Sequence, residues 1–301
     1  MKKPIIWGPL KKFIEDTKIH EIIVDSAEDS IICNQGGTRK GPKFKPAELM
    51  KLAQCLMQYA PDPKSTQAEI LLPGNILVAI VMPPIAPAGP FLRIWKIPQK
   101  TIALEQMVEW GVMSKQQKDY IKNLMQTVQS LIVAGSAGSG KITLLSTLIN
   151  CLPEDFHLVT IEQYADLSIQ RSRTVRFIAP HHKAEELVEL VDLASRARGD
   201  YLVLNSAQGA EILPFIELLR EGHQGVMSLS GENVFDVLKR LEYKVSAHAP
   251  WMSLEDIRFV ITKAFGHIVF QTRENDGKRK LSHLARLELV DGEIKVNPVK
   301  L

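Results

Sequence analysis

Apolar and polar positions recur with two different periods along this chain of 301 residues, and the change between them divides it into two parts. In the first part, alternating segments such as EIIVDS and SIICNQ are mixed with a helical pattern over residues 45–60, where apolar positions recur at i, i+3, i+4 and i+7. Residues 76–97 contain two apolar runs separated by four prolines and Gly89, which predicts a connected pair of strands. This pattern predicts an α+β domain over residues 1–98.

Beyond residue 113 the pattern becomes that of short buried strands alternating with helices. The apolar runs read LIVAGS, HLVTIE, TVRFIA, YLVLNS, VMSLS and HIVFQ. Such alternation predicts an α/β domain, with a mainly parallel sheet covered by helices on both faces. A C-terminal hairpin is expected to turn at Asp291 and Gly292. Residues 99–113, with one predicted helix, are expected to link the two domains, so that the second spans 114–301.

Composition limits the classes of function. A chain of this length with 45% apolar residues can form two packed domains. A formal net charge of +3 is too small to indicate a dedicated nucleic-acid-binding protein. The three cysteines match neither a disulfide framework nor a metal site, which favours a reducing compartment. No apolar stretch approaches the roughly 18 residues that span a bilayer, so a cytoplasmic protein is expected.

Two groups of residues have a second interpretation. Two pairs of lysines flank Ile5, Ile6 and Trp7, as in an interfacial membrane anchor, but a solvated first helix is favoured. His181 and His182 are candidate metal ligands, yet no cysteine or acidic residue stands at ligand spacing from them. A loop after a strand is therefore favoured at these histidines.

The strongest local motif is LIVAGSAGSGKITLL, residues 131–145, in which a buried strand runs into glycines, a lysine and a helix. Glycines allow backbone N–H groups to wrap around phosphates, and the N-terminus of the following helix favours negative charge. The lysine is expected to contact the β- and γ-phosphates of a nucleotide. The predicted nucleotide-binding residues are Gly135, Ser136, Ala137, Gly138, Ser139, Gly140, Lys141, Ile142 and Thr143.

The residue after the lysine departs from this motif. A Ser or Thr hydroxyl is expected there as a ligand of Mg²⁺, but the chain has Ile142. A hydrocarbon does not coordinate a hard cation, and Thr143 is rotated by about 100° around the helix. The loop is therefore expected to hold phosphate but not Mg²⁺, and no other metal site is predicted.

With this loop in place, nearly the whole chain, from KIHEIIVD onward, resembles the type II/type IV secretion ATPase family. Within that family it looks most like the ATPases of Tad-type pilus assembly. The resemblance implies a PAS-like N-terminal domain, a RecA-like P-loop domain, and ATP or ADP bound between them. It also implies a homo-oligomer, with a hexamer favoured, or a hetero-assembly with an active paralogue, positioned peripherally at the inner membrane on a platform protein.

Two of the motifs that carry the resemblance are altered in the middle of the chain. VTIEQYADL is similar to the family's acidic box; it keeps Glu162 but has Gln163 where an aspartate is expected. LASRARGDYLVLNSAQGAE is similar to the Walker B region. In that segment Ser206 stands at the position of the family glutamate and Gln208 at that of an arginine.

Two further motifs are altered in the same way. EGHQGVMSLSGEN is similar to the family's His box; it keeps His223 but has Gly231 in place of the second histidine. LRIWKI stands where the family has an arginine that reaches the nucleotide from the N-terminal domain. The alignment puts Trp95 at that arginine, and a shift of one or two residues assigns Arg93 instead.

The altered motifs weigh against hydrolysis. Phosphoryl transfer depends on a positioned metal, a water-orienting residue and cations on the developing charge. An arginine finger alone contributes about 10³-fold to 10⁵-fold. The favoured interpretation is a non-hydrolysing structural or regulatory subunit of a secretion or pilus machine, with no intact catalytic set. Two alternatives stay open, which are an active or slow ATPase and a nucleotide-binding sensor without hydrolysis.

Overall fold

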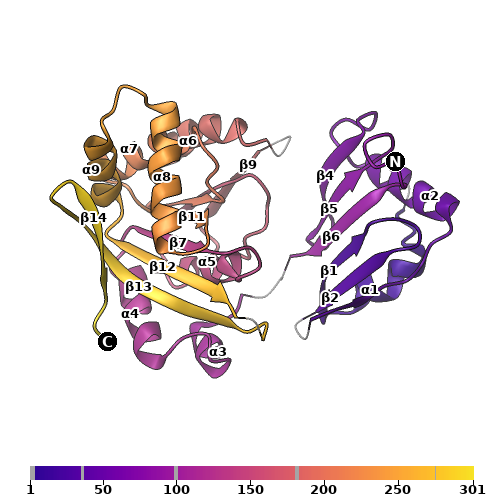
Figure 1. Cartoon of the computed structure of the whole chain (residues 1–301), viewed down its shortest axis with the longest axis horizontal. Helices are drawn as coiled ribbons and strands as arrows, with labels where there is room; N and C mark the ends of the chain where they lie inside the picture. The colour runs from indigo at the N-terminus through magenta and orange to yellow at the C-terminus, as the bar shows by residue number, and fades with distance from the viewer. Residues whose placement is uncertain (1–3, 35–36, 98–100, 180–182, 275) are drawn as a thin grey trace. The chain divides into compact units, whose positions relative to one another are not determined.

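The chain folds into two compact units, Met1–Gln99 and Lys100–Leu301, each with its own sheet and hydrophobic core (Figure 1). The computed structural model describes residues 4–34, 37–97, 101–179, 183–274 and 276–301. Leu104 and Met107, in the segment expected to be a linker, are buried in the core of the second unit. The predicted limits of the domains and of the linker stay a prediction.

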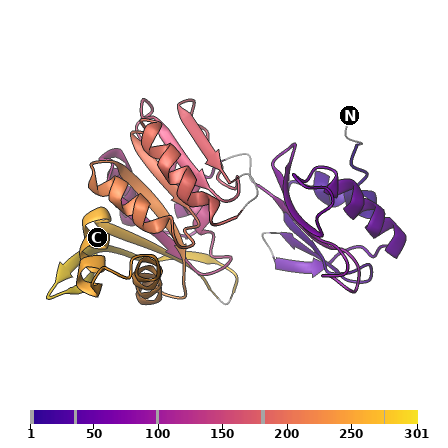
Figure 2. The same cartoon turned by 90° about the horizontal axis from the view of Figure 1, so that it is seen from above.

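The first unit is a six-stranded antiparallel sheet with a helix on one face (Figure 2). The strand order is β3-β2-β1-β6-β5-β4. The apolar stripe predicted in residues 45–60 is buried by α2, whose Leu49, Leu52 and Leu56 pack on the sheet. The elements are η1 (Gly8–Leu10), α1 (Lys11–Glu15), β1 (Ile19–Val24), β2 (Ser30–Asn34), β3 (Gly37–Lys40), α2 (Pro46–Met57), β4 (Gln67–Leu72), β5 (Ile76–Val81) and β6 (Phe91–Lys96).

The N-terminal segment packs on this unit. Ile5 and Trp7 are partly buried against its core, whereas Ile6 is exposed. Helix α1 has no buried residue, which agrees with the predicted solvated helix. Within the described residues, no helix is long and apolar enough to cross a bilayer.

The second unit contains an eight-stranded sheet in the order β14-β13-β12-β7-β11-β10-β8-β9. The six strands from β12 to β9 are parallel, as predicted, and β13 and β14 form the predicted hairpin. Its turn residues Asp291 and Gly292 both have positive φ, 51° and 72°. The strands are β7 (Leu131–Gly135), β8 (Leu158–Glu162), β9 (Thr174–Ile178), β10 (Tyr201–Asn205), β11 (Gln224–Ser230), β12 (His267–Arg273), β13 (Arg279–Val290) and β14 (Glu293–Pro298).

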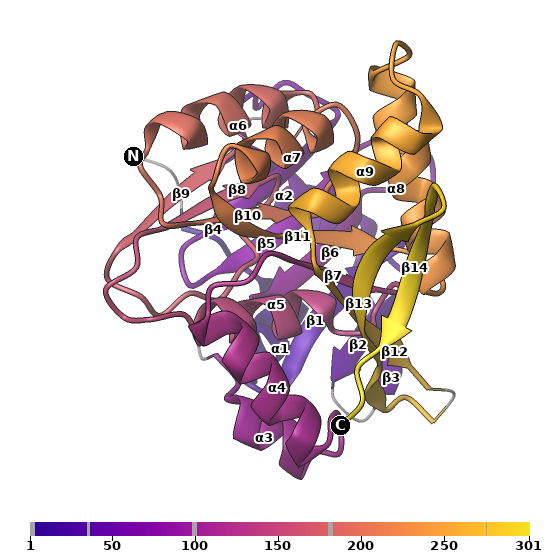
Figure 3. The same ribbon diagram turned by 90° about the vertical axis from the view of Figure 1, so that its left-hand side faces the viewer.

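Helices cover both faces of the second sheet (Figure 3). Side chains alternate along β7, so that Ile132 and Ala134 join the core under α6 to α9, while Leu131 and Val133 join the core under α3 to α5. The helices are α3 (Leu104–Glu109), α4 (Lys115–Gln126), α5 (Lys141–Ile149), α6 (Glu186–Arg196), α7 (Ile212–Arg220), α8 (Val234–His248) and α9 (Leu254–Ala264).

The parallel order decides which motifs meet. Strand β7 lies between β11 and β12, and the loops that follow all six parallel strands leave the sheet at its carboxyl edge. Ligands of open α/β sheets bind at this edge. The loop after β7 therefore lies next to the ends of β11 and β12, and the ends of β10 and β8 follow along the same edge.

Helix α5 is expected to hold the loop after β7 in place through its buried face. Leu145→Ala removes a side chain that is fully buried between α5 and the sheet, and it should lower the free energy of unfolding by about 2–5 kcal/mol. Leu193→Ala on α6 is the matched control, because Leu193 is 44% exposed. Its cost should stay within about 0.5 kcal/mol. Urea unfolding measures both, and equal costs would contradict the packing described.

Candidate functional site

The loop after β7 has the backbone of an anion-binding loop. Gly138 and Gly140 have φ of 72° and 89°, a region that glycine adopts readily. A Cβ added at Gly135 would lie 2.4 Å from the carbonyl oxygen of Gln271 and 2.4 Å from Ser139 Oγ. Side chains are therefore excluded where the strand turns into the loop, and the backbone N–H groups of the loop precede the N-terminus of α5.

Lys141 is the first residue of α5 and is half-buried. Burial lowers the pKa of its ammonium, and the nearby Asp166 carboxyl acts in the opposite direction. Among the described residues, its ammonium has no hydrogen-bond or ion-pair partner. A phosphate in the loop would supply the missing opposite charge.

Ile142 offers no metal ligand, because its side chain has no oxygen. Ile142 packs against the core formed with α3 to α5. The backbone carbonyl of Thr143 accepts a hydrogen bond from Thr147 Oγ1 at 2.9 Å within the same helix. No group of three or more His, Cys, Asp or Glu side chains in the described part of the chain is arranged to hold a metal ion. These residues do not fit the Mg²⁺ site that a P-loop ATPase uses.

Glu162, the retained acidic-box residue, is engaged in a buried ion pair at the end of β8. Its side chain is fully buried, and its two carboxylate oxygens accept hydrogen bonds from Arg176 Nε and Nη2 on β9 at 2.8 and 2.7 Å. Thr160 Oγ1 donates to the same carboxylate at 2.6 Å. A carboxylate that already accepts three hydrogen bonds, two of them from an arginine, is poorly placed to accept a proton from water. Sequence reasoning had no signal for Arg176, which lies on a different strand.

Asp166 is a second buried carboxyl that the sequence analysis did not select. Its Oδ1 accepts a hydrogen bond from Asn205 Nδ2 at 2.5 Å. Burial, with the negative charge of Glu162 in second place, raises the pKa of Asp166 to about 7. Asp166 belongs to the acidic-box segment, and its position as a further acidic residue after Glu162 could have identified it as a candidate from the sequence.

A chain of hydrogen bonds connects Asp166 to the strand that precedes Gly231. Ser228 Oγ on β11 donates to Asn205 Oδ1 at 2.8 Å, and the Ser206 backbone N–H donates to Ser228 Oγ at 2.6 Å. Ser206 has φ 59°, so the chain turns sharply as it leaves β10. The position of the family glutamate is thus a turn residue whose backbone contributes to a neutral polar network.

Gln208 is exposed and lies in the loop after Ser206. The buried carboxylate of Glu211 accepts hydrogen bonds from the backbone N–H groups of Gln208 and Gly209, and Lys244 donates to the carbonyl of Gln208. Gln163 is half-buried, and its amide donates to the Tyr164 hydroxyl at 3.2 Å. Neither glutamine places a charge at the loop.

Gly231 lies beside the glycine loop, because its N–H donates to the carbonyl of Gly135 at 3.3 Å. A Cβ at this position would lie 2.6 Å from Val237 Cγ2 and 2.9 Å from Asp236 Oδ2, both on α8. The start of α8 therefore occupies the space that a histidine side chain would need.

Within the second unit, His223 is not brought to the loop. His223 directly precedes β11 at its amino end, which is the opposite edge of the sheet, about 20 Å along the strand from Ser230. Trp95 is a half-buried residue of β6 in the first unit, and Arg93 forms an ion pair with Glu21 at 2.6 Å. His181 and His182 lie outside the described residues.

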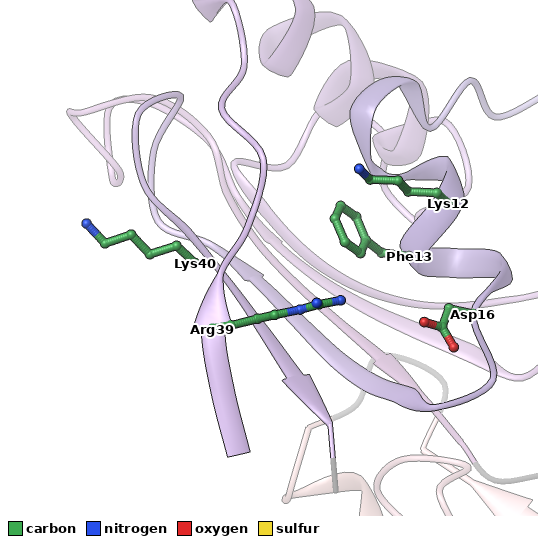
Figure 4. A pocket seen from close by; sticks show the side chains of 5 residues that line it. All are labelled: Lys12, Phe13, Asp16, Arg39 and Lys40. Carbon is green, nitrogen blue, oxygen red and sulfur yellow. The ribbon is translucent and has the colours of Figure 1, made fainter. Parts of the chain in front are cut away.

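The first unit has a basic hollow of its own, with a volume of about 380 Å³ (Figure 4). Lys12 and Arg39 approach the ring of Phe13, with Nζ and Cζ at 4.9 and 5.9 Å from its centroid. Asp16 and Lys40 complete the lining. Because α1, the residue that follows it and β3 supply these residues from separate parts of the chain, no sequence motif predicts the hollow.

The loop, the helix that follows it and the position of both at the carboxyl edge define a P-loop nucleotide-binding fold. The model of the type II/IV secretion system protein family matches residues 49–267. The chain belongs to this family.

Known proteins agree with this assignment. VirB11, a type IV secretion system protein of Bartonella henselae, is 24% identical over 92% of this chain and 90% of its own length. A protein of Mycobacterium tuberculosis named for conjugal transfer is 24% identical over 71% of this chain, which spans 62% of that relative. The crystal structure of the pilus retraction motor PilT with bound ADP covers 96% of this chain and 82% of PilT, with 15% identity and a TM-score of 0.62. That likeness establishes the fold.

Asp166→Asn is expected to remove the cost of ionising a buried carboxyl. The pKa of Asp166 is about 7 in the folded state, whereas the ordinary pKa of the group is 3.8. Between these pH values the folded state binds more protons than the unfolded state, so the wild type loses stability as the pH rises. The free energy of unfolding of the variant relative to the wild type should increase by about 1.4 kcal/mol per pH unit across this window and level off above it. Urea unfolding at a series of pH values measures the difference, and a constant difference would contradict the assignment.

Gly231→Ala is expected to destabilise the second unit by about 1–3 kcal/mol, because the added methyl group overlaps Val237 at the start of α8. Gly266→Ala is the control, since a Cβ there meets no atom within 4 Å and its φ lies outside the left-handed region. Thermal unfolding should show a lower midpoint for the first variant alone. Equal midpoints would mean that α8 does not close over Gly231.

Proposed function

We propose that this chain is a nucleotide-binding subunit of a type II/IV secretion or Tad-type pilus machine that does not hydrolyse ATP and has a structural or regulatory role. The observation that carries the proposal is that the glycine-loop motif keeps its phosphate-binding groups and has lost its metal-binding hydroxyl. Gly138, Gly140 and Lys141 keep the backbone and the cation that hold phosphate, while Ile142 is a partly buried hydrocarbon packed against the core.

The other altered motifs support the loss of hydrolysis. The carboxylate of Glu162 forms an ion pair with Arg176. Ser206 offers a backbone N–H instead of a carboxylate, and α8 fills the space beside Gly231. At Ser206 and Gly231 a group that would hold the metal or orient water is absent, and at Glu162 it is engaged by Arg176. Such groups supply most of the rate of phosphoryl transfer. Together they support nucleotide binding without turnover.

Family resemblance supports the rest of the proposal. ADP is bound in the PilT structure, and VirB11 is named for type IV secretion. By extension, this chain takes ATP or ADP and assembles with itself as a hexameric ring or with an active paralogue. It acts at the cytoplasmic face of the inner membrane on a platform protein, and its first unit serves as the PAS-like domain.

One observation favours a second candidate, a slow ATPase. A carboxyl with a pKa of about 7 is suited to general-base catalysis near neutral pH, and Asp166 is such a group in the neighbourhood of Lys141. Its hydrogen bond to Asn205 and its burial hold it within the polar network described above. This candidate predicts turnover that rises as Asp166 ionises.

The two candidates are separated by ATP hydrolysis measured with Mg²⁺ on wild-type protein, Lys141→Ala and Asp166→Asn. The proposed function predicts that wild type releases no more phosphate than Lys141→Ala. It also predicts that wild type binds ADP and that Lys141→Ala loses about 10-fold or more in affinity, because a hydrogen bond between charged groups is removed. Turnover that both substitutions abolish would establish the slow ATPase instead, and absence of ADP binding would leave only a structural role.

A further inference from the structure

The hairpin formed by β12 and β13 places two arginines against the glycine loop. Arg273 ends β12 and Arg279 begins β13, and the two are directly paired across the strands. A Cβ at Gly138 would lie 3.5 Å from Arg273 Nη1. A Cβ at Gly140 would lie 2.8 Å from Arg279 Cδ and 3.2 Å from its Nε. Both side chains therefore line the rim of the loop.

Neither arginine has an acidic partner among the described residues. In the same hairpin, Lys278 and Lys280 do have partners, with ammonium to carboxylate distances of 3.0 Å to Asp276 and 3.9 Å to Glu274. Like charges directly opposite each other on neighbouring strands are destabilising. Arg279 is exposed on its strand, but the loss of some hydration and, in second place, the neighbouring Arg273 lower the pKa of its guanidinium. Together with Lys141, the two arginines place three cations around the loop, with no anion in contact among the described residues. The three positive charges repel one another.

Two buried polar side chains complete the rim. Gln271 is 2% exposed, its Oε1 has no hydrogen-bond partner within the described structure, and its amide nitrogen lies 3.3 Å from a Cβ placed at Gly140. Ser139 is fully buried, and its Oγ also lacks a partner there. Buried polar groups are normally hydrogen-bonded, and leaving one unpaired is costly. Their position at the loop indicates that a polar ligand provides the partners.

We propose that Arg273 and Arg279, together with Lys141 and the glycine loop, bind the diphosphate or triphosphate chain of a ligand without Mg²⁺, with the two guanidinium groups neutralising the negative phosphate charge that the metal would otherwise neutralise. This inference rests on the proposed nucleotide-binding function and specifies how the site holds phosphate after the loss of the hydroxyl at Ile142.

Arginine suits this role for three reasons. Its guanidinium stays charged even where burial disfavours charge, it is more weakly hydrated than an ammonium, and its planar fork donates two parallel hydrogen bonds to phosphate oxygens. Two such groups supply two positive charges, the same number as one Mg²⁺. The repulsion between Arg273 and Arg279 is relieved when phosphate binds between them, so that ligand binding and the stability of the hairpin reinforce each other.

The test is calorimetric titration with two probes, ADP and inorganic pyrophosphate, each with Mg²⁺ and with EDTA. The proteins are wild type, Arg273→Gln, the Arg273→Gln/Arg279→Gln double variant and Lys280→Gln. Lys280→Gln is the matched control, because it removes one positive charge from the same strand on the opposite face of the ladder. Thermal unfolding without ligand verifies that each variant is folded. If the double variant is not folded, the single variant at the exposed Arg273 carries the test.

Wild type is expected to bind both probes with affinities that EDTA leaves unchanged. Each arginine substitution should weaken binding by about 10-fold or more, and Lys280→Gln should stay close to wild type. Binding that requires Mg²⁺, or equal affinities in wild type and the double variant, would overturn the inference while leaving nucleotide binding intact. Arginine-dependent binding of pyrophosphate without binding of ADP would retain this site and refute the nucleotide function. No binding of either probe would refute both.

Discussion

The close approach of three strand ends at the glycine loop is the constraint on which the rest of the site depends. At Gly135 the carbonyl of Gln271 comes so near that no side chain fits. From the other side of β7, the N–H of Gly231 donates a hydrogen bond to the carbonyl of Gly135. These contacts exist because β7 lies between β11 and β12 in a parallel order. They fix the path of the loop, close the Gly231 position and bring the β12–β13 hairpin to the rim.

The electrostatics of the carboxyl edge follow from which charges are paired. The negative charge of Glu162 is matched by Arg176, and burial favours the protonated form of Asp166. Among the residues that the structure describes, Lys141 and Arg279 beside the loop have no carboxylate partner. A site with matched carboxylates and unmatched cations attracts phosphate.

The altered motifs are part of the packing of the second unit and not isolated losses on an otherwise unchanged surface. Ile142 contributes to the core under α5, and the backbone of Ser206 joins a hydrogen-bond chain with Ser228 and Asn205. The space beside Gly231 is taken by α8. A histidine restored at Gly231 would therefore meet Val237 and Asp236 of α8, a conflict that the sequence alone does not reveal.

The sequence by itself determined the two-part fold, the alternating strands of the second unit, the turn at Asp291 and the loop with Lys141. These features depend on local periodicity and on backbone requirements that one short segment satisfies alone. The tertiary structure decided the rest. It moved His223 to the opposite edge of the sheet and joined Glu162 to a strand partner. It also brought Arg273 and Arg279 to a loop more than a hundred residues earlier, because strand order, which no local pattern encodes, sets which side chains meet.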